Sequence, residues 1–287
     1  MRASSFVAQS DNSDAATTAM QQRTTSAIIL AAGKGTRMKS DLPKVAHQVA
    51  GRSMVEWVAD ACVEAGCSRI VVVVGYQQGV IRRIFDGWSN PRCTLEFAEQ
   101  TEQLGTGHAV RCAEALFAHE KRSPGNDVFV LAGDGPLIRP ETLAALLERH
   151  RSTGASAALA TSVIADSTGY GRIVRDPSGR FVGIVEQKNA TPDQLTIREV
   201  NPSYYCFDAK DVFAALDKVT RDAVSGEFYI TDVPALLMKS GRRVEVIDAV
   251  PPEDVLSINT PEQLAEVDRI LRTRHARTAA HAGRGRP

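Results

Sequence analysis

The chain has 287 residues, 43% of them hydrophobic, which is enough to fill the core of one large α/β domain or two small ones. Thirty-four basic residues balance thirty-four acidic ones, so no net charge attracts the chain to nucleic acid or to an anionic membrane. The sequence holds no apolar run near the ~20 residues of a membrane span and no apolar secretory signal. We therefore expect a globular cytoplasmic protein that binds neither nucleic acid nor membrane.

Residues 1–25 are predicted to form a disordered leader. They are rich in Ser, Thr, Ala, Gln and Asn and hold almost no large apolar side chain, so they cannot bury enough surface to order themselves. Met20 offers an alternative start, in which case residues 1–19 would not belong to the mature chain.

Residues 26–135 alternate apolar runs with amphipathic stretches. The sequence predicts strands at 26–31, 69–75, 93–98 and 127–133, and helices at 53–65, 79–85 and 107–118. Continuous apolar strands indicate a parallel sheet that helices cover on both faces. Ser53 and Glu56 form a capping box, and Gly66 is placed to end that helix. We expect a doubly wound, Rossmann-like α/β fold whose central sheet is mostly parallel.

Residues 136–271 have a more mixed pattern. Pro140 suits the first turn of a helix, and four further strands are predicted at 155–163, 170–176, 180–187 and 199–208. The turn residues 176–179 between the second and third of these predict a hairpin. A helix at 227–241 and a strand at 242–250 complete what we interpret as an insertion-rich lobe at the same sheet edge.

Residues 272–287 hold five arginines and no acidic residue. We interpret them as a basic, disordered, solvated tail rather than as an arm that binds nucleic acid.

The loop after the first strand, LAAGKGTRMKSDLPK, is the clearest candidate site. In doubly wound sheets ligands bind beyond the carboxyl ends of the strands. Gly33 and Gly35 let the backbone approach a phosphate, and four cations supply positive charge: Lys34, Arg37, Lys39 and Lys44. The glycine spacing fits neither a P-loop nor a dinucleotide fingerprint. The loop therefore predicts a polyphosphate site of another type, with an ordinary turn as the alternative.

Cysteine and histidine patterns argue against a zinc site. The five cysteines are spread without a Cys-x-x-Cys pair, and the six histidines form no His-x-x-x-His pair. We expect reduced thiols, and oxygen ligands for any metal.

Eight stretches together make the chain resemble the sugar-nucleotide pyrophosphorylases. Within that family of nucleotidyltransferases it is most similar to the uridyltransferase domain of the bacterial bifunctional N-acetylglucosamine-1-phosphate uridyltransferases. The stretches run from residue 26 to about residue 270: AIILAAGKGTRM, AEQTEQLGTGHAV, LAGDGPLI, TGYGRIV, GIVEQKNAT, EVN, GEFYITDV and INTPEQL. The resemblance implies one nucleotidyltransferase domain at 26–271, with a nucleotide half at about 26–135 and a sugar-binding half at about 136–260.

For the nucleotide, the resemblance implies backbone contacts from Leu30, Ala31, Ala32 and Gly33. It also places Gly105 and Thr106 beside the nucleotide, at the start of a predicted helix.

Three polar side chains complete this end of the site. Arg37 and Lys44 are implied to act on the phosphates, where a planar fork and a point charge suit the oxygens. Gln100 is implied to read uracil, because its amide can donate and accept at once. The alternative interpretation of Gln100 is a solvated glutamine at a strand end, while His108 and Gln103 are expected to be structural.

A magnesium site is implied at Asp134 and Asn259. Asp134 ends a predicted strand at a Gly-Asp-Gly-Pro turn, and Asn259 comes where the run DVLSI stops, before a helix capped by Thr260. A carboxylate and an amide oxygen suit Mg²⁺, which keeps its other places for water and phosphate. Alone, Asp134 would be an ordinary turn aspartate. Gly135 stands where the family often has valine, which we expect to loosen this turn slightly.

The sugar is implied to be held by Gly171, Glu186 and Asn201, through backbone approach, hydroxyl contacts and an amide. One departure from the family is Pro202, which follows Asn201 where Thr or Ser is usual. Proline removes a backbone donor and is expected to stiffen the turn against the sugar.

The reaction implied is Mg²⁺-dependent attack of N-acetylglucosamine 1-phosphate on UTP, giving UDP-N-acetylglucosamine, a cell-wall peptidoglycan precursor, and pyrophosphate. The hexapeptide period of the family's β-helical acetyltransferase domain is missing, so we expect a stand-alone uridylyltransferase, monomeric or a weak homo-oligomer.

Two alternatives stay open. One is the same chemistry with another base or sugar, as in cytidylyl or molybdopterin-guanylyl enzymes, and Gln100 argues against it. The other is a nucleotide-sugar-binding protein without catalysis, which the presence of Lys44, Asp134 and Asn259 opposes.

Overall fold

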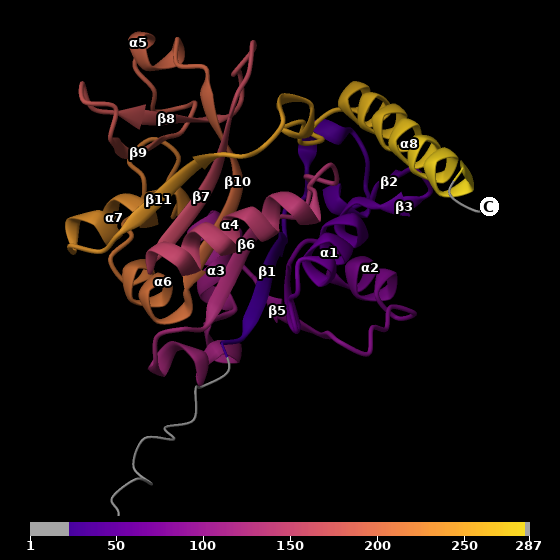
Figure 1. The fold of residues 1–287 in the computed structure, drawn as a ribbon, viewed down its shortest axis with the longest axis horizontal. Coiled ribbons are helices and arrows are strands. Elements are labelled where there is room, and N and C mark those ends of the chain that lie inside the picture. The colour runs from indigo at the N-terminus through magenta and orange to yellow at the C-terminus, as the bar shows by residue number, and fades with distance from the viewer. Residues whose placement is uncertain (1–22, 285–287) are drawn as a thin grey trace, which may run out of the picture.

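A single sheet forms the centre of the protein (Figure 1). The computed structural model describes residues 23–284, with side chains described as far as residue 277. Four strands of the first half are parallel and lie in the order β5-β4-β1-β6. They are β1 (Thr25–Ala31), β4 (Arg69–Val74), β5 (Thr94–Glu99) and β6 (Asp127–Ala132). The mostly parallel sheet predicted from the apolar runs is confirmed.

The second half continues the same sheet rather than starting another. β10 (Glu199–Asp208) lies antiparallel between β6 and β7 (Ala157–Val163), and β11 (Val244–Asp248) pairs parallel with β7. The hairpin of β8 (Gly171–Arg175) and β9 (Phe181–Val185) pairs with the start of β10. The hairpin is confirmed at the predicted turn, and it brings the second half to the carboxyl edge of β1 and β6.

Helices cover both faces of the sheet, because its strands are apolar on both sides. One face packs on α1 (Met54–Glu64), α2 (Gln78–Ile84) and α4 (Pro140–Thr153). The other packs on α3 (Thr106–Cys112), α6 (Ala209–Leu216) and α7 (Val233–Lys239). Adjacent residues of β1 alternate between the two cores, since Ile28 belongs to one and Ile29 to the other. This is the doubly wound fold expected from the sequence.

The predicted helix boundaries follow from local chemistry. The Ser53 backbone N–H donates to Glu56 Oε2 at 2.8 Å, and the capping box of α1 is complete. Gly66 follows the end of α1 with φ of 93°, a left-handed conformation that favours glycine. Pro140 opens α4. The helix predicted at 227–241 is shorter, since the α-helical turns begin only at Val233.

Shorter elements complete the chain. The hairpin β2 (Gln48–Val49) and β3 (Arg52–Ser53) precedes α1, and α5 (Pro192–Leu195) follows β9. Six 3-10 turns are η1 (Thr36–Met38), η2 (Lys44–Ala46), η3 (Glu114–Phe117), η4 (Glu120–Arg122), η5 (Ile230–Asp232) and η6 (Pro252–Asp254). α8 (Pro261–Arg284) packs on the β2–β3 hairpin through a small core that includes Val267 and Leu271.

The two predicted ends need correction. The leader was expected to reach residue 25, but Thr25 already belongs to β1; residues 1–22 lie outside the described residues. The basic tail was expected to be disordered from residue 272, but α8 continues to Arg284. Arg274 explains part of this order, because its Nη1 donates to Leu137 O at 3.1 Å and its guanidinium contacts buried Asp254. Residues 285–287 again lie outside the described part.

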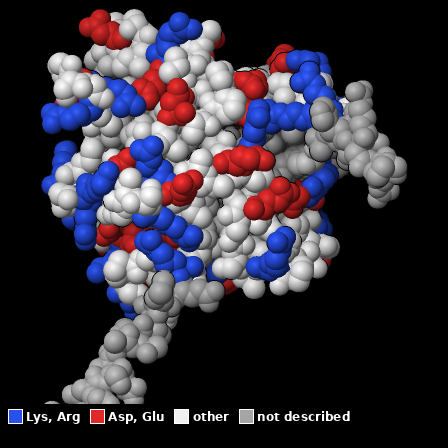
Figure 2. Space-filling view, viewed as in Figure 1, with Lys and Arg blue, Asp and Glu red and all other residues white. Residues whose placement is uncertain are grey.

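In the described part of the chain, no helix is both long and apolar enough to cross a membrane. Positive and negative side chains are interspersed on the face shown in Figure 2, as expected for a chain with no net charge. Charge that recognises an anion must therefore be local.

Candidate active site

A cavity of about 310 Å³ lies at the carboxyl edge of β1 and β6. Its walls come from the loops that leave these strands and from the start of α3. The lining includes the predicted residues Leu30, Ala32, Gly33, Lys44, Gln100, Gly105, Thr106 and Asp134. Most of the predicted nucleotide residues are thus brought to one cavity. Ala31 is the exception, because it is buried in the helix-covered core beside Ile29.

The glycine loop is shaped by Gly35 rather than by Gly33. Gly35 has φ of 70°, and a Cβ there would lie 2.5 Å from the Lys44 Cβ. Only glycine therefore lets the loop close over Lys44. A Cβ on Gly33 would meet no atom of the chain within 4 Å, so its exposed backbone faces open space that a ligand can occupy.

Two of the loop's four cations converge on the carboxyl edge. The Arg37 Nη2 donates to Asn259 Oδ1 at 2.7 Å, and the Lys44 Nζ donates to the same oxygen at 2.6 Å. The Lys44 ammonium also forms an ion pair with Asp134. Lys34 instead lies over the Tyr76 ring, 5.1 Å from its centroid. The residues predicted for phosphate and for metal thus form one cluster, although they are up to 222 positions apart.

The backbone fixes this cluster from both sides. Asp134 follows β6, and its carbonyl accepts from the Ile258 N–H at 3.1 Å. The Asn259 N–H donates to Gln263 Oε1 at 2.7 Å, and the Gln263 N–H donates to Thr260 Oγ1 at 3.3 Å, which caps α8. The predicted cap is confirmed, and it holds Asn259 at a helix start.

The donor set of Asp134 and Asn259 fits a magnesium ion. Both side-chain oxygens already contact one cationic group, the Lys44 ammonium, so they face a common point. Carboxylate and amide oxygens are ligands that Mg²⁺ accepts, with water and phosphate filling its other positions. Within the described residues no three His, Cys, Asp or Glu gather into a metal-binding group.

Gln100 is buried, follows the last residue of β5 and lines the cavity. Its Nε2 donates to Gly105 O at 3.1 Å and lies 3.0 Å from His108 Nδ1. Because the chain's own acceptors engage the amide nitrogen, the carbonyl oxygen is the atom that Gln100 presents to a ligand. Gln100 was expected to donate and accept; the structure favours the accepting role.

Gly105 is required by a close backbone approach. It has φ of 102°, and a Cβ there would lie 2.6 Å from Phe228 O. The Thr106 Oγ1 accepts from the Ile230 N–H at 3.0 Å. The start of α3 is therefore packed against residues 228–230, which places both halves of the chain around the cavity.

The predicted sugar residues meet beside the β8–β9 hairpin. Asn201 pairs with Gly171, and Glu186 comes directly after β9, which pairs with β8. The Thr231 Oγ1 donates to Glu186 Oε1 at 2.9 Å. Burial raises the pKa of Glu186 above its usual value, and the Thr231 hydrogen bond only partly offsets this. The Asn201 Nδ2 donates to the Tyr205 hydroxyl at 2.6 Å.

Pro202 lies in an irregular part of β10. The register of β10 against β7 shifts between Val200 and Tyr204, and Ser203 has φ of 66°. Pro202 therefore falls where the ladder is interrupted, and its missing N–H costs little there. The Asn201 Oδ1 accepts from the Ser203 N–H at 3.1 Å, which fixes the turn next to the predicted sugar residues.

Comparison with known proteins adds an independent finding. The family model described as the MobA-like NTP transferase domain matches residues 27–227, which is more than half of the chain. The chain belongs to this family of NTP transferases. The match runs from β1 to the end of the cavity wall at Glu227, so the family region holds the glycine loop and the Asp134 turn.

Among NTP transferases the chain is similar to proteins named "Bifunctional protein GlmU". It is 45% identical over 249 residues to that of Geobacter metallireducens, covering 86% of this chain and 50% of the relative. It is 43% identical over 264 residues to that of Heliobacterium modesticaldum, covering 92% and 55%. It is 42% identical over 248 residues to that of Bacillus cereus, and the match covers 86% of this chain and 52% of the relative. The chain thus spans about half the length of the curated relatives it matches.

Four residues of the candidate site were not predicted from the sequence to belong to it. His108 and Thr231 hold Gln100 and Glu186, while Ser257 and Gln263 hold Asn259. Each holds the side chain or backbone of a predicted residue. The only signal for them is the capping pattern that places Gln263 behind Thr260.

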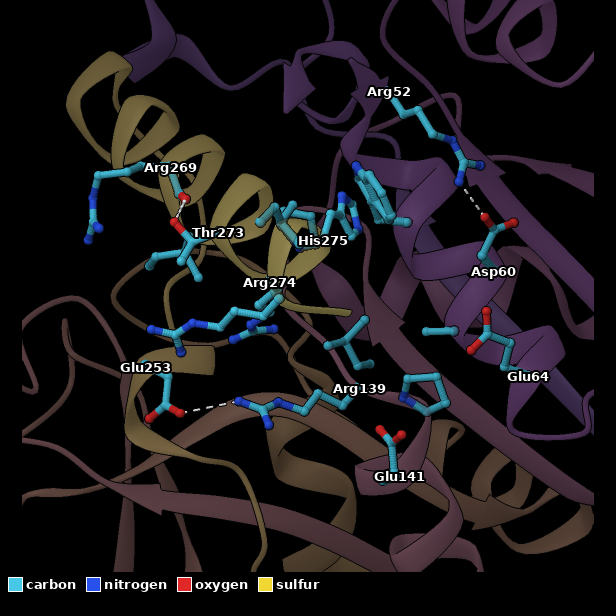
Figure 3. A pocket seen from close by; sticks show the side chains of 18 residues that line it. Arg52, Asp60, Glu64, Arg139, Glu141, Glu253, Arg269, Thr273, Arg274 and His275 are labelled. Atoms are coloured by element: carbon cyan, nitrogen blue, oxygen red, sulfur yellow. Dashed lines mark hydrogen bonds and ion pairs between the residues drawn. The ribbon is translucent and has the colours of Figure 1, made fainter. Parts of the chain in front are cut away.

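A larger hollow of about 1000 Å³ lies outside the candidate site, between α8, α1 and the start of α4 (Figure 3). Arg139 pairs there with Glu253 at 3.2 Å and with Asp254, and Arg52 pairs with Asp60 at 2.6 Å. Because the chain's own carboxylates already neutralise these arginines, we do not place the substrate phosphates in this hollow.

Proposed function

We propose that the chain is a Mg²⁺-dependent uridylyltransferase that makes UDP-N-acetylglucosamine and pyrophosphate from UTP and N-acetylglucosamine 1-phosphate. One observation carries the proposal: Arg37, Lys44, Asp134 and Asn259 form one cluster, and two of its members, Lys44 and Asp134, line the same cavity as Gln100. Similarity to the bifunctional relatives supports it over about half their length.

The cluster suits transfer between two anions. A phosphate oxygen of the sugar 1-phosphate is already ionised near neutral pH, so the attack on the α-phosphorus of UTP needs no general base. Catalysis then depends on alignment and on neutralising like charges. Mg²⁺, when bound by Asp134 and Asn259, supplies positive charge to the phosphates.

The chain's own residues have separable roles. Arg37 offers a fork to the phosphate oxygens, and Lys44 offers a point charge. Both cations contact Asn259 Oδ1, so phosphate oxygens would compete for the same donors. Gln100 accepts from the N3–H of uracil in the cavity.

The sugar end selects by hydrogen bonding. Glu186 accepts from sugar hydroxyls, Asn201 serves a hydroxyl or the acetamido group, and the Gly171 backbone approaches the ring. Gly171 and Asn201 lie side by side on paired strands, which suits contacts along one edge of a ring.

The deciding experiment measures pyrophosphate release with each of the four common nucleoside triphosphates, crossed with a panel of hexose 1-phosphates and with Mg²⁺ present or chelated. We expect turnover with UTP and N-acetylglucosamine 1-phosphate only when Mg²⁺ is present. Turnover with another base or sugar would replace the substrate. Tight binding of the nucleotide sugar without turnover would favour a silent binding protein.

A further inference from the structure

A hydroxyl group joins the two ends of the site. Tyr170 lies in the loop before β8, next to the predicted sugar residue Gly171. Its hydroxyl donates to Val255 O at 3.1 Å and accepts from the Ser257 N–H at 3.4 Å. The segment that carries Val255 and Ser257 crosses from β11 to α8 and leads to Asn259 (Figure 1). One side chain of the sugar loop thus makes two bonds to the segment that carries the predicted metal ligand.

The sugar side of this link is fixed by a buried arginine. Arg172 is almost fully buried, and its guanidinium donates to Tyr170 O and, at 2.8 Å, to Gln187 Oε1. The same Gln187 oxygen accepts from the Gly169 N–H at 3.1 Å. Because Gln187 follows Glu186, these bonds hold the loops that carry Gly171 and Glu186 in one arrangement.

The metal side of the link ends at the amide of Asn259. Its Nδ2 donates to Ser257 Oγ at 3.2 Å and lies 3.4 Å from Ser257 O. An amide whose nitrogen is bound on one side must turn its oxygen to the other. That oxygen receives Arg37 and Lys44, so Ser257 sets which atom of Asn259 faces the phosphate and metal site.

We propose that Tyr170 is a positioning residue whose hydroxyl couples the sugar end of the site to the metal and phosphate end. The inference rests on the proposed function. Binding of the sugar phosphate against Gly171 and Glu186 stabilises this arrangement of the Tyr170 loop, and through the Tyr170 hydroxyl it stabilises Ser257 and the orientation of Asn259. By reciprocity, binding of the metal nucleotide tightens the sugar phosphate site by the same factor.

The substitution Tyr170→Phe isolates the hydroxyl. The Tyr170 ring packs against the hydrophobic core on the sheet face that α1, α2 and α4 cover. Phenylalanine keeps that packing. Tyr76→Phe is a matched control, because its hydroxyl lies 3.5 Å from Asp41 O in the glycine loop and makes no hydrogen bond to residues 255–259. Thermal unfolding of each variant shows that the fold is kept.

The first test needs no ligand and no activity. Amide hydrogen exchange of the peptide covering residues 255–259 should be about two- to tenfold faster in Tyr170→Phe, because the Ser257 N–H loses its acceptor. Tyr76→Phe should exchange there like the unsubstituted protein. Unchanged exchange in Tyr170→Phe would show that the link does not hold this segment, and would overturn the inference whatever the substrate is.

The second test measures coupling by calorimetry. N-acetylglucosamine 1-phosphate is titrated into the protein with and without Mg²⁺ and α,β-methylene-UTP, which cannot turn over. In the unsubstituted protein we expect the metal nucleotide to lower the Kd of the sugar phosphate about tenfold, within the range usual for coupled sites. Tyr170→Phe should reduce that factor to about threefold or less, with the Kd of the sugar phosphate alone within about twofold of normal.

Ser257→Ala provides the second variant, since it removes the hydroxyl that accepts from the Asn259 amide nitrogen. If both hydroxyls act through one link, the double variant loses no more coupling than either single variant. Additive losses, or full coupling in Tyr170→Phe, would refute the link. Failure of the unsubstituted protein to bind either ligand would instead refute the proposed function. The hydrogen-exchange test uses no ligand, so it would still test the link in that case.

Discussion

Asn259 shows how much of the site depends on the orientation of a single amide. Its oxygen receives two cations, and its nitrogen is occupied by Ser257. A rotation that exchanged the two atoms would face two cations with N–H donors, which is repulsive. The neighbours of Asn259 therefore decide whether its oxygen can serve as a metal ligand.

Arg37→Ala tests the role of the fork. We expect kcat/KM for pyrophosphate release to fall about 10²- to 10³-fold, the loss typical of one electrostatic donor. Arg37→Lys should recover only part, because it keeps the charge but not the planar fork. Arg37 is exposed, so chemical denaturation should show a stability within about 0.5 kcal/mol of normal. Near-normal turnover in Arg37→Ala would contradict the assignment.

The pH dependence of sugar binding should report Glu186. Burial raises its pKa above the ordinary 4.5, and the ionised carboxylate accepts more strongly from sugar hydroxyls than the protonated acid does. The KM of the sugar 1-phosphate should therefore begin to rise, as the pH falls, at a higher pH than an ordinary glutamate would give. In Glu186→Gln that rise should disappear while titration of the substrate phosphate remains. Identical KM profiles for the two proteins would argue against contact between Glu186 and the sugar.

At the scale of elements, Gly105 and Gly33 have different roles in the candidate site. Gly105 has no room for a side chain, since a Cβ there would lie 2.6 Å from Phe228 O and 2.8 Å from Glu227 Cβ. Gly33 is fixed by nothing in the chain, and its bare backbone faces the cavity. Gly105 is thus needed for the fold, whereas we expect Gly33 to be needed for binding.

Alanine at each position should separate these needs. Gly105→Ala should lower the free energy of unfolding by about 1–3 kcal/mol, because it forces a left-handed residue against Phe228 O. Gly33→Ala should leave stability within about 0.5 kcal/mol and instead raise the Kd of UTP. Urea denaturation and calorimetry measure the two effects. Equal loss of stability in both variants would show that the contrast is wrong.

The elements also show what a sequence can predict here. Buried strands such as β1 and β4 can be predicted from their uninterrupted apolar residues, and α1 can be predicted from its capping residues. The antiparallel insertion of β10 leaves no such signal, because strand order depends on partners distant in the chain. The helix expected from residue 227 starts later because Phe228 bonds Leu104 and Gly107 instead. α8 exceeds its expected end because its tertiary contacts, including that of Arg274, outweigh the charged composition.

The candidate site was predictable only in part for the same reason. The glycine loop is continuous in sequence and carries its own signal, whereas Asp134 and Asn259 could be paired only through resemblance to a family. The supporting residues His108, Thr231 and Ser257 carry no pattern of their own. Their roles come from packing between elements, which a linear pattern does not record.

At the scale of the whole molecule, a buried ion-pair cluster and the candidate active site lie at opposite edges of the sheet. Asp127 is buried at the amino end of β6, whereas Asp134 follows its carboxyl end. Arg151 Nε donates to Asp127 Oδ2 at 2.6 Å, and His150 Nε2 lies 3.2 Å from Oδ1. This cluster ties α4 to the sheet without touching the site.

Acid stability should therefore depend on Asp127. Burial would raise its pKa, but the bonds from His150 and Arg151 outweigh burial and hold the pKa below the ordinary 3.8. A lowered pKa stabilises the folded chain above the ordinary value, and that contribution is lost as the pH falls through 3.8 and below. Asp127→Asn should cost on the order of 3 kcal/mol at neutral pH and flatten the acid limb of the stability curve. Denaturant unfolding across pH checks this, and an unchanged acid limb would contradict it.

The length and anchorage of α8 make it a natural handle for the molecule. Its 24 residues extend roughly 36 Å from the turn that bears Asn259. Buried Val267 and Leu271, with Arg274 hooked to Leu137 O, brace its middle. Strain applied to the outer turns would have to loosen that brace before it reached the first turn. A dye, surface tether or fused protein placed there is mechanically insulated from the chemistry at the other end.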